Sequence, residues 1–165
     1  MIRPFLRYPD KRLRTAAAAV GEIDDAVRAI WDDMIETMDA MPGVGLAAPQ
    51  IGVMQALAVV DASTERGQAV RFANPVLVGA STEFRDVAEG SPNLPGVSAK
   101  VSRPDWVEVS FVNADGQEEQ RRFDGLWATS IQHQIDHLAG RMYFDRLSRV
   151  KREMLIKKAR KGGAS

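Results

Sequence analysis

Residues 132–140 read QHQIDHLAG, a stretch that contains both histidines of the chain, His133 and His137. A spacing of four residues on an α-helix brings two imidazoles onto one face, one turn apart, where they can bind one metal ion. Packed or capping histidines show the same spacing, so this pattern alone leaves both interpretations open. Asp124 can begin such a helix, and Gly140 follows where a left-handed residue commonly ends one.

The residue after the first histidine determines which chemistry the helix can support. In the hydrolytic HExxH motif, a Glu at this position takes a proton from a metal-bound water. Gln134 occupies the position here, and an amide has no carboxylate to accept that proton. The pattern therefore predicts metal ligands without a general base. For Asp136 three roles stay open: a third ligand, a residue that orients an imidazole, or a surface carboxylate.

The segments before this helix predict antiparallel strands. Residues 56–60 form a run typical of a buried strand, and residues 70–78 form a second extended stretch that is interrupted by Asn74 and Pro75. Residues 106–112 alternate apolar and polar side chains. They lead through the turn residues 113–116 to a polar partner that ends at Phe123, which indicates a hairpin.

Two further helices are predicted, one near each end of the chain. After the candidate N-cap Asp24, apolar residues recur with helical spacing until Pro42 and Gly43, at Val27, Ile30, Trp31, Met34 and Met38. Ser148 begins a terminal helix rich in Lys and Arg. Most basic helices of this kind are solvated surface, and an acidic partner such as ribosomal RNA is the alternative.

Composition bounds the class of protein. A chain of 165 residues suits one domain, residues 1–165, and its formal net charge of zero gives no electrostatic case for DNA or a membrane surface. The chain has no cysteine, which excludes disulfides and thiolate ligands. We see no apolar run long enough to span a bilayer and no signal-peptide pattern. We therefore expect a cytoplasmic protein.

Two stretches rich in Gly and Pro remain, residues 43–52 and 89–96. The first allows close approach of the backbone to a ligand or a strand, and its Gln50 can bind a ligand carbonyl or fix the loop. It is not a phosphate loop, because no Gly-Lys-Ser/Thr follows. The second stretch, taken by itself, is interpreted as a turn-rich loop.

Together, Gly43–Gln50, Glu89–Gly96 and Gln132–Gly140 resemble, in order and at similar spacing, the three motifs of the peptide deformylases. The resemblance covers nearly the whole chain. It implies an α+β fold in which antiparallel β-sheets wrap a central helix carrying HxxxH, with an N-terminal helix and a C-terminal basic helix. It also implies removal of the formyl group from the N-terminal Met of nascent chains, with Fe, Zn or Ni held by two His and one Cys.

The resemblance assigns binding roles to residues of this sequence. His133 and His137 match the metal ligands, Gln50 matches the side chain that contacts the formyl oxygen, and Gly45 matches a glycine that lines the substrate. The family's pocket for the Met side chain corresponds to Val44, Val87, Leu126 and Ser130.

The departures from the family pattern fall on the chemistry. Ser91 replaces the Cys ligand, and a hydroxyl is a poor anionic ligand near neutral pH. Gln134 replaces the general acid/base Glu. Pro92 replaces a Leu whose backbone N–H helps to stabilise the oxyanion, and proline has no N–H. Asn93 replaces a Ser, and Ser98 replaces an Arg that holds the peptide.

Three hypotheses follow. Loss of a general base costs about 10²–10⁴ in rate and loss of an oxyanion donor about 10²–10³. The first hypothesis is therefore a naturally degenerate pseudoenzyme that binds formyl-Met or Met peptides, or the ribosome, with weak metal or none. The second is a metal-dependent peptide deformylase with rearranged ligands: His133 and His137, with Asp136 or a water bound to Ser91. The third is a structural or interaction role in which the pocket has closed.

Overall fold

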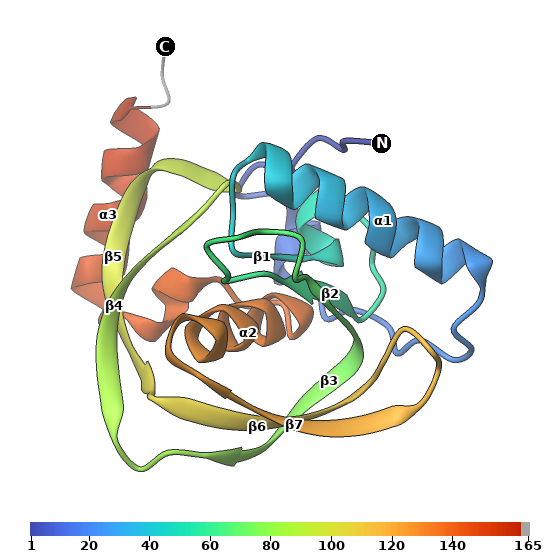
Figure 1. The fold of residues 1–165 in the computed structure, drawn as a ribbon. Helices are drawn as coiled ribbons and strands as arrows, with labels where there is room; N and C mark the ends of the chain where they lie inside the picture. Colours follow the sequence, from blue (N-terminus) through green and yellow to red (C-terminus); the bar gives the residue numbers. More distant parts are fainter. Residues whose placement is uncertain (163–165) are drawn as a thin grey trace.

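The computed structural model describes residues 1–162 and is organised around helix α2 (Gly125–Leu138). In Figure 1, strands surround α2, helix α1 (Asp25–Ala40) lies above it, and helix α3 (Arg149–Gly162) lies beside β5 at one edge. Short 3₁₀ helices occupy Lys11–Arg14 (η1), Ala48–Ile51 (η2) and Tyr143–Arg146 (η3). The α+β arrangement predicted from the sequence is confirmed.

The strands of residues 1–162 form two antiparallel sheets. The larger has the order β1-β2-β3-β6-β7, and the smaller consists of β4 and β5. The bounds are Gly45–Ala47, Leu57–Val60, Val70–Ala80, Phe84–Ser91, Leu94–Pro104, Trp106–Val112 and Glu118–Asp124, for β1 to β7 in order. The two predicted strands and the predicted hairpin are therefore confirmed. A register shift in β3 falls at Asn74 and Pro75, as the interruption there suggested.

One loop prediction is wrong. Residues 89–96 are mostly strand, because β4 continues to Ser91 and β5 resumes at Leu94. Ser91 pairs with Leu94, so Pro92 and Asn93 form the tip of a hairpin. Proline is tolerated here because Pro92 lies in the turn, where its fixed φ is favourable and the ladder needs no N–H from it.

The helix ends agree with the sequence in most respects. The Asp24 side chain accepts a hydrogen bond from the backbone N–H of Val27, which confirms it as the cap of α1. Gly140 has φ +78° just after α2, as predicted. Asp124 does occupy the N-cap position of α2, but its side chain makes no capping bond, because it pairs with Arg122 instead.

Three apolar clusters hold these elements together. One packs α1 against β1 and β2, around the buried Trp31. A second packs the apolar side of α2, including Ile131 and Leu138, against the larger sheet. The third packs η3 and α3 against β5. The opposite side of α2, which carries His133, therefore faces the β4–β5 hairpin. Within residues 1–162 no helix has the length and apolar character needed to cross a membrane.

Candidate functional site

A cavity of about 390 Å³ lies between α2, β4 and the segment that joins α1 to β1. The residues expected to bind substrate all line it, namely Val44, Gly45, Val87, Leu126 and Ser130. It is also lined by most of the candidate catalytic and metal-binding residues, Gln50, Ser91, Pro92, His133 and Gln134. The remaining candidate, His137, is buried and contacts His133. The structure thus brings residues of three separated motifs to one cavity.

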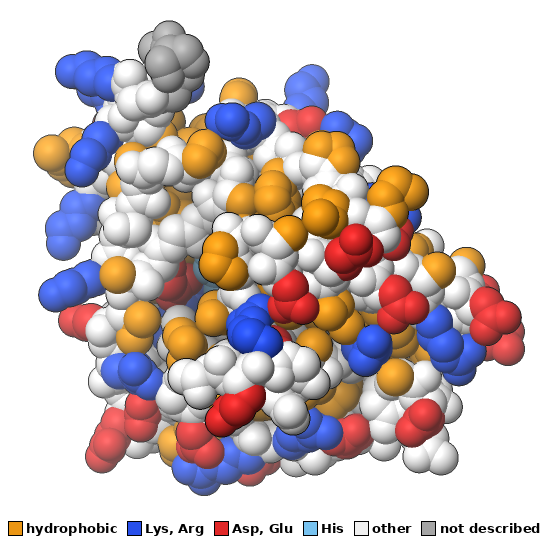
Figure 2. Space-filling model, turned by 45° about the horizontal axis from the view of Figure 1, so that its top comes forward, with side chains coloured by type: hydrophobic (Ala, Val, Ile, Leu, Met, Phe, Trp, Pro, Cys, Tyr) orange, Lys and Arg blue, Asp and Glu red, His pale blue; other side chains and the backbone are white. Residues whose placement is uncertain are grey.

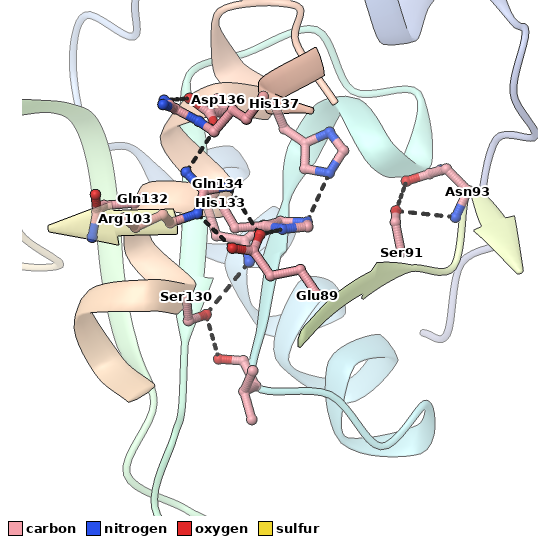
Figure 3. Close-up of polar contacts among 12 residues, drawn as sticks. Glu89, Ser91, Asn93, Arg103, Ser130, Gln132, His133, Gln134, Asp136 and His137 are labelled. Atoms are coloured by element: carbon pink, nitrogen blue, oxygen red, sulfur yellow. Dashed lines mark hydrogen bonds and ion pairs between the residues drawn. The ribbon is translucent and has the colours of Figure 1, made fainter. Parts of the chain in front are cut away.

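The two histidines contact each other directly (Figure 3). Their Nε2 atoms are 3.1 Å apart, so the helical spacing brings the rings together as predicted. Nδ1 of His133 lies 2.8 Å from a carboxylate oxygen of Glu89, and it must donate because a carboxylate only accepts. Nδ1 of His137 is buried and has no partner among the described residues. The ring of Tyr143 stacks on His133 at 5.9 Å between centroids.

A buried ionic network lies beneath this pair and connects β4, β5 and α2. Arg103 donates to both oxygens of Glu89 at 2.6 and 2.9 Å, and to Asp136 at 2.9 Å. Arg146 donates to both oxygens of Asp136 at 2.6 and 2.7 Å. Asp136 is therefore neither a metal ligand nor a surface carboxylate, and the rearranged ligand set that included it is unsupported.

Burial and pairing set the charges in this region. Burial lowers the pKa of His137 well below its usual value, and the charges of His133 and Arg103 lower it further, so His137 is neutral near pH 7. Burial raises the pKa of Glu89, but hydrogen bonds from His133 and Arg103 outweigh it and bring that pKa below its ordinary value. Burial likewise raises the pKa of Asp136, and Arg146 and Arg103 lower it by more.

Gln50, Ser91 and Asn93 form a second polar group at the hairpin tip, part of which Figure 3 shows. Nε2 of Gln50 donates to Oδ1 of Asn93 at 2.8 Å and lies 3.4 Å from Oγ of Ser91. Oε1 of Gln50 accepts from the backbone N–H of Ala47 at 2.9 Å. The Ser91 hydroxyl lies 3.1 Å from the same Asn93 oxygen. Gln50 is thus tied to the protein on both ends of its amide.

Gln134 faces β1 from α2. Its Nε2 lies 3.5 Å from Oγ of Ser130, which donates to the carbonyl of Val44 at 2.9 Å. A Cβ at Gly45 would stand 2.4 Å from that Nε2 and 2.3 Å from the Ser130 oxygen. Only glycine fits there without a shift. Oε1 of Gln134 is buried and has no partner within residues 1–162.

The donor set fits a divalent metal only in part. Two nitrogens that bind one tetrahedral ion at about 2.0–2.1 Å lie roughly 3.4 Å apart, close to the 3.1 Å between the His133 and His137 Nε2 atoms. The position at which the resemblance implies a Cys ligand holds Ser91, whose neutral hydroxyl bonds to Asn93. Within residues 1–162, no group of three His, Cys, Asp or Glu side chains is arranged to hold an ion. The residues present therefore do not complete the ligand set that the resemblance implies.

The sequence analysis assigned no role to four residues of this region: Glu89, Arg103, Arg146 and Tyr143. A signal existed for Arg103. It follows the buried Val101 by two residues, and alternate residues of a strand point to the same face, so Arg103 had to point inward. An inward Arg needs a buried carboxylate partner. No comparable local pattern identifies Arg146 or Tyr143.

The antiparallel sheets around an HxxxH helix, with a cavity beside its histidines, define an α+β domain of the deformylase class. A family model described as polypeptide deformylase matches residues 2–153. The chain belongs to the peptide deformylase family.

Similar proteins agree with this assignment. The peptide deformylase of Methylocella silvestris is 42% identical, over 97% of this chain and 84% of its own length. A peptide deformylase-like protein of Rhizobium meliloti is 40% identical, over 97% of this chain and 92% of its own length. Among solved structures, a peptide deformylase from Legionella pneumophila superposes with a TM-score of 0.93 at 35% identity, covering 99% of this chain and 96% of that one. The actinonin complex of the Ehrlichia chaffeensis peptide deformylase gives 0.92 at 32% identity, with 99% of each chain covered.

Proposed function

We propose that this chain binds Met-headed peptides in its cavity and lacks ordinary deformylase turnover. The observation that carries the proposal is that, in the described part of the chain, no free carboxylate lies beside the two histidines. Gln134 takes the position of the general base, and both oxygens of Glu89 are bound by Arg103 and His133. A carboxylate held this way, with a lowered pKa, is a poor proton acceptor near neutral pH.

Two further features lower the expected rate. Pro92 lines the cavity but has no N–H to stabilise an oxyanion. Ser91 offers no thiolate to complete the metal site. The missing base and the missing oxyanion donor cost about 10²–10⁴ and 10²–10³ in rate, and together they remove several orders of magnitude even without full additivity.

The binding part of the proposal rests on the cavity itself. Its apolar wall consists of Val44, Val87 and Leu126, and a volume of about 390 Å³ admits a Met side chain together with the adjoining backbone. Such an open cavity disfavours the hypothesis that the old pocket has closed. The solved relative from Ehrlichia chaffeensis holds actinonin, and we propose that the same ligand binds this chain.

A direct experiment combines turnover with binding. The purified protein is supplied with Fe²⁺, Ni²⁺ or Co²⁺ and a formyl-Met peptide, and released formate is measured. In parallel, Met peptides and actinonin are titrated calorimetrically. We expect no measurable formate but saturable binding, which Val44→Asp should weaken at least tenfold by placing a charge on the apolar wall. Robust formate release would refute the loss of turnover, and absence of any binding would refute the binding role.

The second candidate is a metal-dependent peptide deformylase with rearranged ligands. It is favoured by the closeness of the two Nε2 atoms, at 3.1 Å, and by the names of the similar proteins. Because Asp136 is held by two arginines, the remaining ligand set is His133 and His137 with a water bound to Ser91. Tightly bound stoichiometric metal in the purified protein would favour this candidate over the first.

We also propose α3 as a ribosome contact. Figure 2 shows Lys and Arg side chains along the edge of the molecule that α3 forms. The helix buries Leu155 and Ala159 against β5, and its basic residues face outward. Co-sedimentation with ribosomes tests this contact. The wild type should sediment with them, and a variant with Lys157, Lys158 and Lys161 changed to Glu should not. Failure to co-sediment at low salt would exclude it.

A further inference from the structure

We infer that the cavity selects peptides with a free α-amine over formylated peptides. This inference rests on the proposed function and names its ligand class. It follows from hydrogen-bonding groups around the cavity: the donors that Gln50, Ser91 and position 92 could offer a formyl oxygen are engaged or absent, whereas the buried oxygen of Gln134 has no partner among residues 1–162.

The donors come first. A formyl group presents a carbonyl oxygen, which needs an N–H or O–H when it leaves water. Both hydrogens of the Gln50 amide have acceptors within the protein, the Asn93 oxygen at 2.8 Å and the Ser91 oxygen at 3.4 Å. The Ser91 hydroxyl has the same Asn93 oxygen as its acceptor at 3.1 Å. Pro92 has no N–H. A formyl oxygen would therefore have to displace an existing bond.

The free acceptor is Oε1 of Gln134. It is buried, no described residue bonds to it, and the side chain lines the cavity. The amide orientation agrees with its neighbour Ser130, whose hydrogen is donated to the carbonyl of Val44. Only lone pairs of the Ser130 oxygen face Gln134, whose NH₂ group lies 3.5 Å from them, while Oε1 has no partner among residues 1–162. A ligand N–H bound to that oxygen would relieve an unpaired buried acceptor.

The two headgroups differ in what they present. A free α-amine presents N–H donors to Gln134. A formylated nitrogen presents one N–H and adds a carbonyl oxygen, to which Gln50, Ser91 and Pro92 offer no free donor. Leaving that oxygen unpaired costs the formyl peptide on the order of ten- to a hundred-fold in affinity. The amine binds uncharged, and since roughly a tenth of α-amino groups are uncharged at pH 7, its own affinity falls about tenfold. The net preference for the free amine is therefore at most about tenfold.

Isothermal titration with three peptides tests the inference. Met-Ala-Ser is used with a free, a formylated and an acetylated N-terminus, on the wild type and on variants whose folding is checked by thermal unfolding. Gln134→Met removes the acceptor and should reduce affinity for the free amine. Gln134→Glu, the matched control, keeps an acceptor and should retain that affinity or raise it.

Two more variants act on the donors. Asn93→Ser frees the Gln50 amide, and Pro92→Ala restores a backbone N–H. Each should raise affinity for the formyl peptide more than affinity for the free amine, since the Gln134 acceptor is unchanged. Because Asn93 also bonds to the Leu6 and Gln50 carbonyls, Pro92→Ala provides the test if Asn93→Ser fails to fold.

The outcomes separate this inference from the proposed function. Formyl-peptide binding equal to or tighter than free-amine binding overturns the inference and leaves a peptide-binding role intact. A selectivity ratio unchanged in the folded donor variants, Asn93→Ser or Pro92→Ala, also overturns it. If no peptide binds the folded wild type, the proposed function fails, and the inference fails with it.

Discussion

The guanidinium of Arg103 lies 2.9 Å from the carboxylate of Asp136, across the boundary between the β4–β5 sheet and α2. Both side chains are almost fully buried. This contact holds the hairpin that forms one wall of the cavity against the helix that forms another. The cavity is therefore shaped by an ionic contact as much as by apolar packing, and its integrity depends on keeping both partners.

Arg103→Met should destabilise the protein by about 3–5 kcal/mol, because it leaves two buried carboxylates without their shared cation. Arg149→Met is the control, since the Arg149–Glu153 pair is exposed and should contribute less than about 1 kcal/mol. Urea unfolding of both variants measures the difference. Equal midpoints for the two variants would contradict a structural role for the network.

Ser91→Cys should convert the histidine pair into a metal site. A thiolate supplies the anionic third ligand that the hydroxyl cannot, so the variant should retain nearly stoichiometric Zn²⁺ or Co²⁺ after dialysis. Metal analysis, with the thiolate absorption of the Co²⁺ form, is the measurement. Ser98→Cys adds a thiol on the exposed side of β5 and should bind no more metal than the wild type. A metal-free Ser91→Cys protein would count against this account.

Gly45→Ala should weaken peptide binding. The added Cβ would stand 2.3 Å from Oγ of Ser130 and 2.4 Å from Nε2 of Gln134, so both side chains must move. Such overpacking costs about 1–3 kcal/mol in stability. Gly21→Ala is the matched control, because nothing lies within 4 Å of its added Cβ. Calorimetric titration and thermal unfolding measure the peptide affinity and the stability of both variants. Equal values for Gly45→Ala and Gly21→Ala would contradict the prediction.

Asp61 should make stability depend on acid pH. Burial raises the pKa of this carboxyl, but hydrogen bonds from Ser63 and from the backbone of Gln68 lower it by more, so the folded-state pKa lies below the ordinary value. Its contribution is therefore present above the unfolded pKa of about 3.9 and is lost as pH falls through the lower folded value. In Asp61→Asn, the decline in unfolding free energy below about pH 4 should be shallower. Asp115→Asn, on an exposed turn, controls for removal of one carboxylate. If the unfolding free energies of Asp61→Asn and the wild type fell in parallel with decreasing pH, this contribution of Asp61 would be contradicted.

The features that the sequence predicted correctly are those set by local pattern. The apolar spacing from Val27 to Met38 identified α1, because a helix that buries one face carries apolar residues about once per turn along it. The alternation over residues 106–112 identified the hairpin for the same reason. The positions of His133 and His137 on one helix face required only the helical period.

The features that escaped prediction depend on contacts between distant segments. Arg103 and Asp136 are 33 residues apart, and nothing near Asp136 in the sequence indicates that two arginines bind it. The hairpin at residues 89–96 was hidden because Pro and Gly favour turns locally, whereas pairing between β4 and β5 determines the outcome. Engagement of the Gln50 amide by Asn93 also depends on tertiary packing.

If the chain has lost hydrolysis as proposed, the proline at the hairpin tip bears on whether it could regain it. Single replacements at positions 91 and 134 can return a thiol and a carboxylate. The main-chain hydrogen absent from residue 92 can come only from changing that residue itself. Each reversion taken alone restores only one of three groups: the thiol, the carboxylate or the backbone N–H. It would therefore raise the rate of hydrolysis too little to be selected. In a lineage that has lost deformylation, Pro92 would therefore make a return to hydrolysis harder.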